Sequence, residues 1–143
     1  MRQSFIRLLA RLRRSWRRRR RDTHQAAPAV RVTTLLKSSV TAGGQPIAFP
    51  QKDPQVVVAI YEIPPGTALS DHQHPFPRYG YILSGRLRVT NSETGQVDVY
   101  GPGDFGIEAI GQWHYGETIG AETVKILVID QVEKDRENVV LRA

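Results

Sequence analysis

The 143-residue sequence contains no cysteine, only one methionine and only four histidines. The lack of cysteine excludes disulfide bonds and thiolate metal sites. No run of 18 apolar residues is present that could span a bilayer. The sequence also has no P-loop, no dinucleotide-binding glycine fingerprint and no nucleophile-elbow serine. These absences remove several enzyme classes and make the few histidines the most informative residues.

Charge is distributed unevenly along the chain, whose net charge is +6. Residues 1–22 contain ten arginines and one aspartate, giving +9, whereas the remaining residues carry ten basic and thirteen acidic side chains, giving −3. We therefore expect a basic arm attached to a mildly acidic domain. Since the excess positive charge lies in the arm, we do not expect nucleic acid to bind to the domain.

The arm is predicted to be an arginine-rich amphipathic helix or a disordered segment. One apolar stripe with helical spacing is formed by Phe5, Leu8, Leu9, Leu12 and Trp16. A tail without a specific role, docking of residues 1–21 on an anionic membrane surface, a targeting peptide and a nucleic-acid arm all remain open. Arginines interrupt the apolar segment, which argues against a secretory signal, so we expect a cytoplasmic protein with membrane association as an alternative.

After a short linker at residues 23–29 the apolar pattern changes to a period of two, with frequent turn signals. The expected strands cover residues 30–36, 46–50, 55–63, 79–83, 86–91, 96–100, 105–109, 114–119 and 124–132. No helical period follows residue 22. We predict an all-β sandwich or small barrel over residues 30–133, followed by a charged tail at residues 134–143.

Three of the four histidines lie in two places, at His72 with His74 and at His114. Side chains two residues apart on an extended strand leave the same face, with Cα atoms roughly 6.6 Å apart. A metal ion about 2 Å from each imidazole nitrogen can bridge that gap. A third imidazole on a neighbouring strand would add another ligand. The simpler alternative is a pair of solvated loop histidines, and the residues around the pair decide between the two.

Those residues follow a known spacing. Gly66 is followed after five residues by His72 and then His74, after three more by Arg78, and after another six by Gly85. This is the spacing of the first cupin motif, G-x5-H-x-H-x3-4-E-x6-G, with Arg78 in the place of the acid. The stretch therefore resembles the small single-domain members of the cupin superfamily.

A second motif supports the same resemblance. Gly103, Ala109, Gly111, His114 and Thr118 keep the spacing of G-x5-P-x-G-x2-H-x3-N, with alanine for proline and threonine for asparagine. The resemblance implies a double-stranded β-helix, that is a jelly-roll barrel. Small cupins commonly dimerise, so it also implies a homodimer.

The resemblance further implies a metal site, because cupins usually hold one divalent metal ion with three histidines and a glutamate. Carried over, this gives His72, His74 and His114 as ligands of one divalent transition metal, which could be Fe, Mn, Ni or Zn. Three protein ligands leave coordination positions open, which is typical of a catalytic site.

The arginine at the acid position leaves three arrangements open, because a guanidinium cannot ligate a metal. The three histidines could hold the metal alone. Glu108, on the strand expected at residues 105–109 and immediately before the proline position of the second motif, could supply the fourth ligand. Alternatively the site could hold no metal, with Arg78 pairing an acidic residue or an anionic ligand.

The leading functional hypothesis is a metal-dependent, dioxygenase-like oxidoreductase that acts on a small oxygenated or anionic molecule. Arg78, Tyr81 and Trp113 are the candidate substrate-binding residues, and core packing is the alternative for the two aromatic side chains. No residue is assigned as a catalytic acid or base. The rival hypothesis is a non-catalytic module that binds or senses a small molecule or anion.

Overall fold

The computed structural model describes residues 29–143, which form nine β-strands and no helix. The strands are β1 (Pro54–Ile63), β2 (His72–Gln73), β3 (Arg78–Ser84), β4 (Arg86–Asn91), β5 (Val97–Tyr100), β6 (Phe105–Ile107), β7 (His114–Ile119), β8 (Val124–Glu133) and β9 (Val140–Leu141). None of the described residues belongs to a helix that could cross a membrane. The arginine-rich arm and nearly all of the linker lie outside the described residues.

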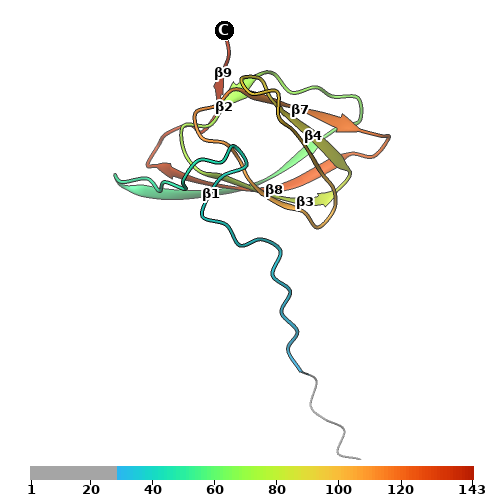
Figure 1. Cartoon of the computed structure of the whole chain (residues 1–143), viewed down its shortest axis with the longest axis horizontal. Helices are drawn as coiled ribbons and strands as arrows, with labels where there is room; N and C mark the ends of the chain where they lie inside the picture. Colours follow the sequence, from blue (N-terminus) through green and yellow to red (C-terminus); the bar gives the residue numbers. More distant parts are fainter. Residues whose placement is uncertain (1–28) are drawn as a thin grey trace, which may run out of the picture. The chain divides into compact units, whose positions relative to one another are not determined.

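The strands form two antiparallel sheets, ordered β1-β8-β3-β6 and β5-β4-β7-β2-β9. In Figure 1, β1, β8 and β3 lie along one side of the folded unit, and β2, β4, β7 and β9 lie along the other. Neighbours in each sheet are often far apart in sequence, as β1 and β8 are, which is the jelly-roll topology. The predicted all-β jelly-roll fold is confirmed.

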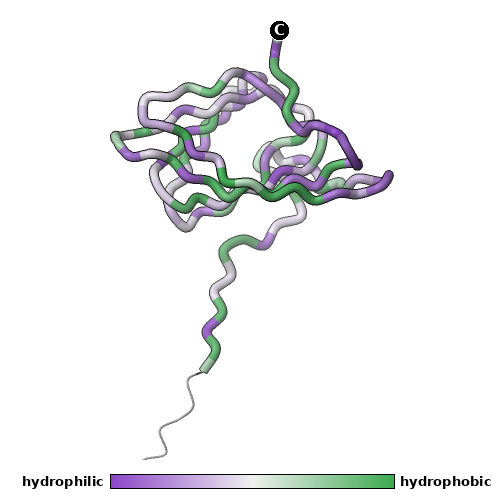
Figure 2. Tube along the Cα trace, turned by 180° about the vertical axis from the view of Figure 1, so that it is seen from behind, coloured by the Kyte–Doolittle hydropathy of each residue, from purple (hydrophilic) through white to green (hydrophobic). Residues whose placement is uncertain are grey.

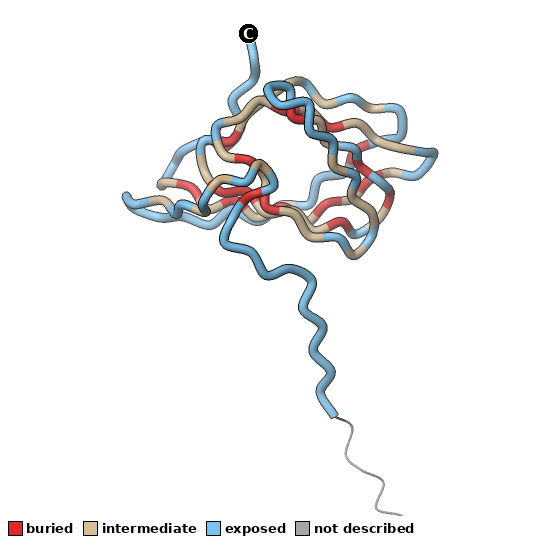
Figure 3. Tube along the Cα trace, in the orientation of Figure 1, coloured by how far each residue is buried: buried red, intermediate tan, exposed pale blue. Residues whose placement is uncertain are grey.

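The core is organised by β8, whose residues alternate between buried and half-buried from Val124 to Glu133. This alternation follows from the pleat, which directs successive side chains to opposite faces. Val124, Ile126 and Val128 pack with side chains of neighbouring strands, including Ile82. The buried segments, red in Figure 3, lie in both layers. The inward face of β8 also carries the buried Asp130, a charged residue that needs a partner.

Three segments differ from the expected elements. Residues 30–36, although rich in β-branched side chains, belong to no ladder, and residues 46–50 contribute only an isolated bridge at Pro46. Strand propensity is not sufficient where no neighbouring strand is available. Conversely, the tail at residues 134–143 contributes β9, which pairs with β2. The described chain from Thr33 to Ala143 forms one compact unit, while the domain limits drawn from the sequence stay predictions.

Gly85 joins β3 to β4 with a φ of +69°, and a Cβ atom there would lie 2.8 Å from both the carbonyl oxygen of Thr123 and the Cα of Val124. We predict that Gly85→Ala lowers the free energy of unfolding by about 2–4 kcal/mol, because left-handed backbone strain and a backbone clash add together. Gly95→Ala is the matched control, since Gly95 has a φ of +75° and no neighbour within 4 Å. Urea denaturation followed by circular dichroism measures both variants, and equal losses would contradict the packing argument.

Candidate metal centre

The three histidines converge on one point. His72 in β2 is the ladder partner of His114 in β7, and His74 forms an isolated bridge with Ile110. The centroids of the rings of His72 and His114 are 4.6 Å apart, and each lies 4.9 Å from that of His74. His74 and His114 are buried and His72 is half-buried. The two-residue spacing therefore places both imidazoles on one face, as the sequence predicts.

Glu108 completes the cluster immediately after β6. Its backbone N–H donates to the carbonyl oxygen of Arg78 at 2.9 Å, which fixes the residue beside β3. Its Oε2 atom lies 2.9 Å from Nε2 of His74 and 3.1 Å from Nε2 of His114. One potential ligand atom from each of His72, His74, Glu108 and His114 lies within 4.8 Å of the other three. The cluster could hold a metal ion.

The second nitrogen of each ring determines how the ring is oriented. The Nδ1 atoms of His72, His74 and His114 lie 2.7, 2.5 and 2.9 Å from the backbone carbonyl oxygens of Ser70, Asn138 and Gln112, respectively. Because a carbonyl only accepts, each Nδ1 carries a proton and Nε2 is the acceptor of the neutral ring. Metal-binding histidines are typically held in this way.

This donor set suits a divalent cation. In the neutral rings, Nε2 atoms and the Glu108 carboxylate present lone pairs to one another at close range, which is unfavourable unless a cation or additional protons lie between them. Imidazole nitrogen and carboxylate oxygen together suit transition metals such as Fe, Mn and Zn. The residues present therefore fit the metal that the sequence resemblance implies.

Burial and mutual contacts set the protonation of the cluster. Burial favours the neutral form of Glu108, but the hydrogen bonds with Nε2 of His114 and His74, which require a proton on each Nε2 when no metal ion is bound, outweigh it and hold the pKa of Glu108 well below its usual range. Burial also opposes a charge on His114, but the hydrogen bond with Glu108 outweighs it and raises the pKa of His114. At His72 burial dominates and lowers the pKa. Near neutral pH, Glu108 is thus ionised and His72 is neutral, the forms that bind metal.

A family model described as the cupin domain matches residues 59–130, which include all four clustered residues. The chain belongs to the cupin family. The match confirms the resemblance drawn from the two motifs. A comparison with curated proteins found no match.

Solved cupin structures resemble the barrel. Oxalate decarboxylase of Bacillus subtilis, a protein with Mn(II) centres, is 29% identical with a TM-score of 0.51, over 60% of this chain and 23% of its own. The Lactobacillus farciminis oxalate decarboxylase is 27% identical with a TM-score of 0.52, over 60% and 26%. The DMSP lyase DddQ of Ruegeria pomeroyi is 24% identical with a TM-score of 0.54, over 68% and 46%. This chain thus spans about a quarter of the decarboxylases, and the lyase supports the fold alone.

Arg78 occupies the motif's acid position without placing an unpaired charge in the barrel. Its Nε and Nη2 atoms donate to the two carboxylate oxygens of Asp130 at 2.7 and 2.8 Å, and Nη2 also donates to the hydroxyl of Tyr61 at 3.2 Å. This two-point contact stabilises the buried guanidinium. The acidic residue of the cluster is thus Glu108, which follows β6, and not a residue of β3 as in the motif. The backbone N–H of Glu108 is hydrogen-bonded to the carbonyl oxygen of Arg78. Pairing of Arg78 with an acidic residue, one of the open alternatives, thus coexists with the Glu108 cluster.

Two cavities adjoin the cluster and share the lining residues Leu87, Val89, Glu108, His114 and Ile126. The larger has a volume of about 230 Å³, and it is also lined by His72, Arg78 and Tyr61. It could hold roughly seven waters at about 30 Å³ each, which is enough for a small ligand. Nη1 of Arg78 makes no hydrogen bond within residues 29–143 and is available to such a ligand.

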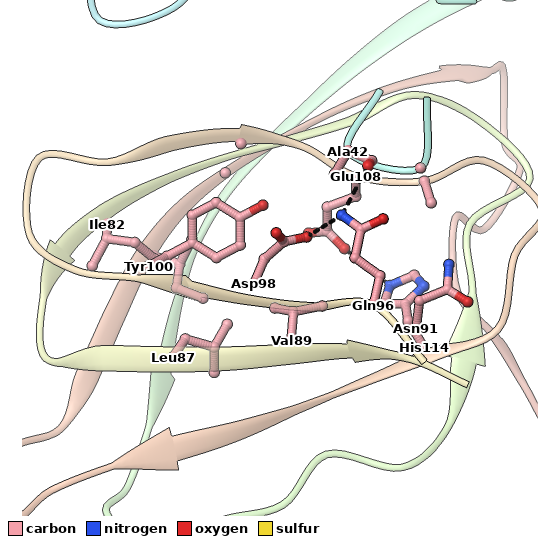
Figure 4. A pocket seen from close by; sticks show the side chains of 15 residues that line it. Ala42, Ile82, Leu87, Val89, Asn91, Gln96, Asp98, Tyr100, Glu108 and His114 are labelled. Atoms are coloured by element: carbon pink, nitrogen blue, oxygen red, sulfur yellow. Dashed lines mark hydrogen bonds and ion pairs between the residues drawn. The ribbon is translucent and has the colours of Figure 1, made fainter. Parts of the chain in front are cut away.

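The smaller cavity has a volume of about 60 Å³. In Figure 4, Glu108 and His114 lie toward one end of this cavity with the amide groups of Gln96 and Asn91, while the ring of Tyr100 and other apolar side chains line the opposite end. At this size it could hold about two waters. The larger cavity is therefore the better candidate for a substrate site.

Tyr81 and Trp113, which the sequence suggested as substrate-binding residues, line neither cavity. Gly80 and Ile82, the neighbours of Tyr81 in β3, line the smaller cavity, so Tyr81 faces the opposite side of the sheet. The ring of Trp113 lies beneath the guanidinium of Arg142, with 5.3 Å between the guanidinium carbon and the ring centroid. Of the three candidates, only Arg78 is brought to the cluster.

Asn138 is a supporting residue that sequence reasoning missed. Its carbonyl oxygen accepts the bond from Nδ1 of His74, its side-chain oxygen accepts from the N–H of Phe76 at 2.9 Å, and its side-chain amide donates to Asp130 at 2.6 Å. The residue thus links His74 to the Asp130–Arg78 pair. No motif spacing could identify it, because it lies in the charged tail, 64 residues from His74.

We predict that Asn138→Ala lowers the affinity for Zn²⁺ by about ten- to a hundredfold, because loss of the side-chain anchors releases the carbonyl that orients His74. Competition with a chromophoric chelator measures the affinity. Glu137→Ala is the matched control, since Glu137 is the exposed neighbour in sequence. Equal affinities for the two variants would show that Asn138 does not position the ligand.

Proposed function

We propose that this cupin binds one divalent transition-metal ion through His72, His74, Glu108 and His114, and that it is a metal-dependent enzyme acting on a small carboxylate-bearing molecule. The observation that carries the proposal is the convergence of four donor atoms, with each imidazole held by a backbone carbonyl. The cluster opens into a cavity of about 230 Å³ that also contains Arg78.

A metal ion bound at this cluster would supply open coordination positions and polarise substrate oxygens. Arg78 would bind a substrate carboxylate through its unbonded Nη1 atom, while Asp130 holds the guanidinium in place. Val139 and Leu141 of the C-terminal segment line the same cavity and would limit the access of water. The reaction class that we propose is a dioxygenase-type oxidation of a small oxygenated acid. The similarity to oxalate decarboxylase, named for a small dicarboxylate, supports the substrate class.

A second candidate function is a non-catalytic module that binds a small anion. One observation favours it. Apart from the cluster itself and the Arg78–Tyr61 pair, the larger cavity is lined by apolar residues, Gly116 and Ser70, so its lining offers no general acid or base beyond the cluster and the Tyr61 hydroxyl. Dependence of ligand binding on metal distinguishes the two candidates.

We predict that the purified protein carries close to one transition-metal ion per chain, and that the double variant His72→Ala/His74→Ala carries none. Glu108→Gln should keep the fold but lower metal affinity at least tenfold, because an amide is a weaker ligand than a carboxylate. Glu122→Gln, at an exposed position, is the matched control. Elemental analysis measures the stoichiometry, and unchanged metal content in the double variant would rule out the site.

We predict that oxalate, used as a model small carboxylate, binds to the metal-loaded protein, and that Arg78→Lys weakens the binding at least tenfold. Lysine retains the charge, but it lacks the planar guanidinium that lets arginine bind both oxygens of Asp130 and still present a free nitrogen to a ligand carboxylate. Isothermal titration calorimetry measures the binding, with Arg86→Lys on the exposed face of β4 as the control.

The result from the metal-free protein decides between the candidates. Oxalate binding that requires the metal supports the enzyme, and an oxygen electrode then tests for oxygen uptake with a panel of small carboxylic acids. Equally tight binding without metal would favour the anion-binding module.

A further inference from the structure

The larger cavity beside the cluster combines one cationic side chain with a mostly aliphatic wall. Aliphatic side chains line it from β1, β4, β8 and β9 and from the loop before β2. Among the described residues, Arg78 is the single lysine or arginine that lines it. Figure 2 shows hydrophobic segments, in green, in the layer of β1 and β8 and just before the C-terminus. Such a cavity suits a ligand that has one anionic end and an apolar body.

In the sheet that contains β3, the charged and the apolar parts of the wall lie at different levels. The inward face of β8 carries Asp130, the ladder partner of Arg78, and Ile126 lies four residues before it. Four residues along a strand span about 13 Å. Val128 lies midway, and both Val128 and Ile126 line the cavity. The wall therefore changes from charged to aliphatic along the length of β8.

In the other sheet the apolar level begins directly beside the cluster. His114 in β7 is followed on the same face by Gly116, whose ladder partner in β4 is Val89. A Cβ atom at Gly116 would lie 3.3 Å from Cδ1 of Leu69 and 3.4 Å from Cδ1 of Leu87. Both leucines line the same cavity. The glycine therefore keeps the cavity wide between these leucines, where any side chain would make it narrower.

The volume of the cavity limits the size of the apolar body. An apolar cavity of about 150 Å³ holds one benzene molecule, and this cavity has a volume of about 230 Å³. It is thus large enough for about six carbon atoms together with one carboxylate. A second carboxylate at the apolar end would face aliphatic side chains without a cation to pair with it, which is costly.

We propose that the substrate is a monocarboxylic acid whose apolar body contains about six carbon atoms. Its carboxylate binds Nη1 of Arg78 beside the cluster, and its body packs against Leu69, Val89 and Val128. This inference rests on the proposed function and specifies the class of substrate. Oxalate has no apolar body, so it binds only at the charged end of the cavity, and dicarboxylic acids with longer chains are disfavoured.

Isothermal titration calorimetry of the full-length, Zn²⁺-loaded protein with acetate, butyrate and hexanoate tests the proposal. The affinity should rise about fourfold for each added methylene group, because each one leaves water for an apolar wall. A second comparison uses glutarate and 5-methylhexanoate, which have the same shape but carry a carboxylate and an isopropyl group, respectively, at the distal end. The 5-methylhexanoate should bind at least about tenfold more tightly, since its distal end needs no cation.

The outcomes separate this inference from the proposed function. If oxalate binds but hexanoate binds no more tightly than acetate, or if glutarate binds more tightly than 5-methylhexanoate, the apolar body is wrong and the metal-dependent function stands. If none of the acids binds, oxalate included, both proposals are overturned.

Substitution of Gly116 tests where the body lies. Gly116→Ala should weaken hexanoate binding at least about fivefold and change acetate binding less than about twofold, because the added methyl group occupies only the apolar level. Gly80→Ala is the matched control, since a Cβ atom there would lie 3.4 Å from Cγ2 of Ile126 but Gly80 lines the smaller cavity. It should change neither affinity.

A variant with the opposite effect keeps the test decisive if Gly116→Ala does not fold, which circular dichroism and zinc content would show. Leu69→Ala removes side-chain atoms from the wall of the cavity and should raise the affinity for octanoate relative to hexanoate. An unchanged preference for chain length in Leu69→Ala, or an equal loss of acetate and hexanoate binding in Gly116→Ala, would overturn the placement of the body.

Discussion

The barrel places a carboxylate among three imidazoles, and much of the surrounding structure serves to hold that contact. Glu108 is ionised although burial opposes it, because Nε2 of His114 and of His74 lie within hydrogen-bond distance of its carboxylate and need a proton or a metal ion between them and it. Each imidazole is in turn fixed by a backbone carbonyl bound to its Nδ1 atom, which directs Nε2 inward. A chain that oriented the rings differently would lose both the stabilisation of the carboxylate and the donor set for a metal.

The positions of the buried charges, a guanidinium in β3 and a carboxylate immediately after β6, also depend on having partners within the barrel. The first cupin motif has an acid where this chain has Arg78, and a buried guanidinium requires a carboxylate of its own. Asp130, on the inward face of β8, meets that requirement, and Asn138 connects the pair to His74. Each buried charge thus has its own partners: Glu108 contacts the histidines, and Arg78 pairs with Asp130. Substitution of either acid affects the ligand geometry as well as the local charge.

Much of this site could be predicted from the sequence, and the limits have physical reasons. The two-residue spacing of His72 and His74 fixes their common face, because the pleat of a strand is local. The sequence left Glu108 as one alternative among three, since its contact with His74, 34 residues away, is a long-range contact. Asn138 could not be found, because it lies in a charged tail that reaches the cluster only through long-range contacts, such as the pairing of β9 with β2. The strand predicted at residues 30–36 is not formed, because no described strand pairs with this segment.

Anomalous diffraction from metal-loaded crystals, recorded on both sides of the absorption edge of the metal, tests the central claim most directly. The account predicts one anomalous peak per chain, about 2.0–2.2 Å from Nε2 of His72, His74 and His114 and from one carboxylate oxygen of Glu108. A peak at another place, a metal bound without Glu108, or imidazoles turned so that Nδ1 faces the cluster would contradict it.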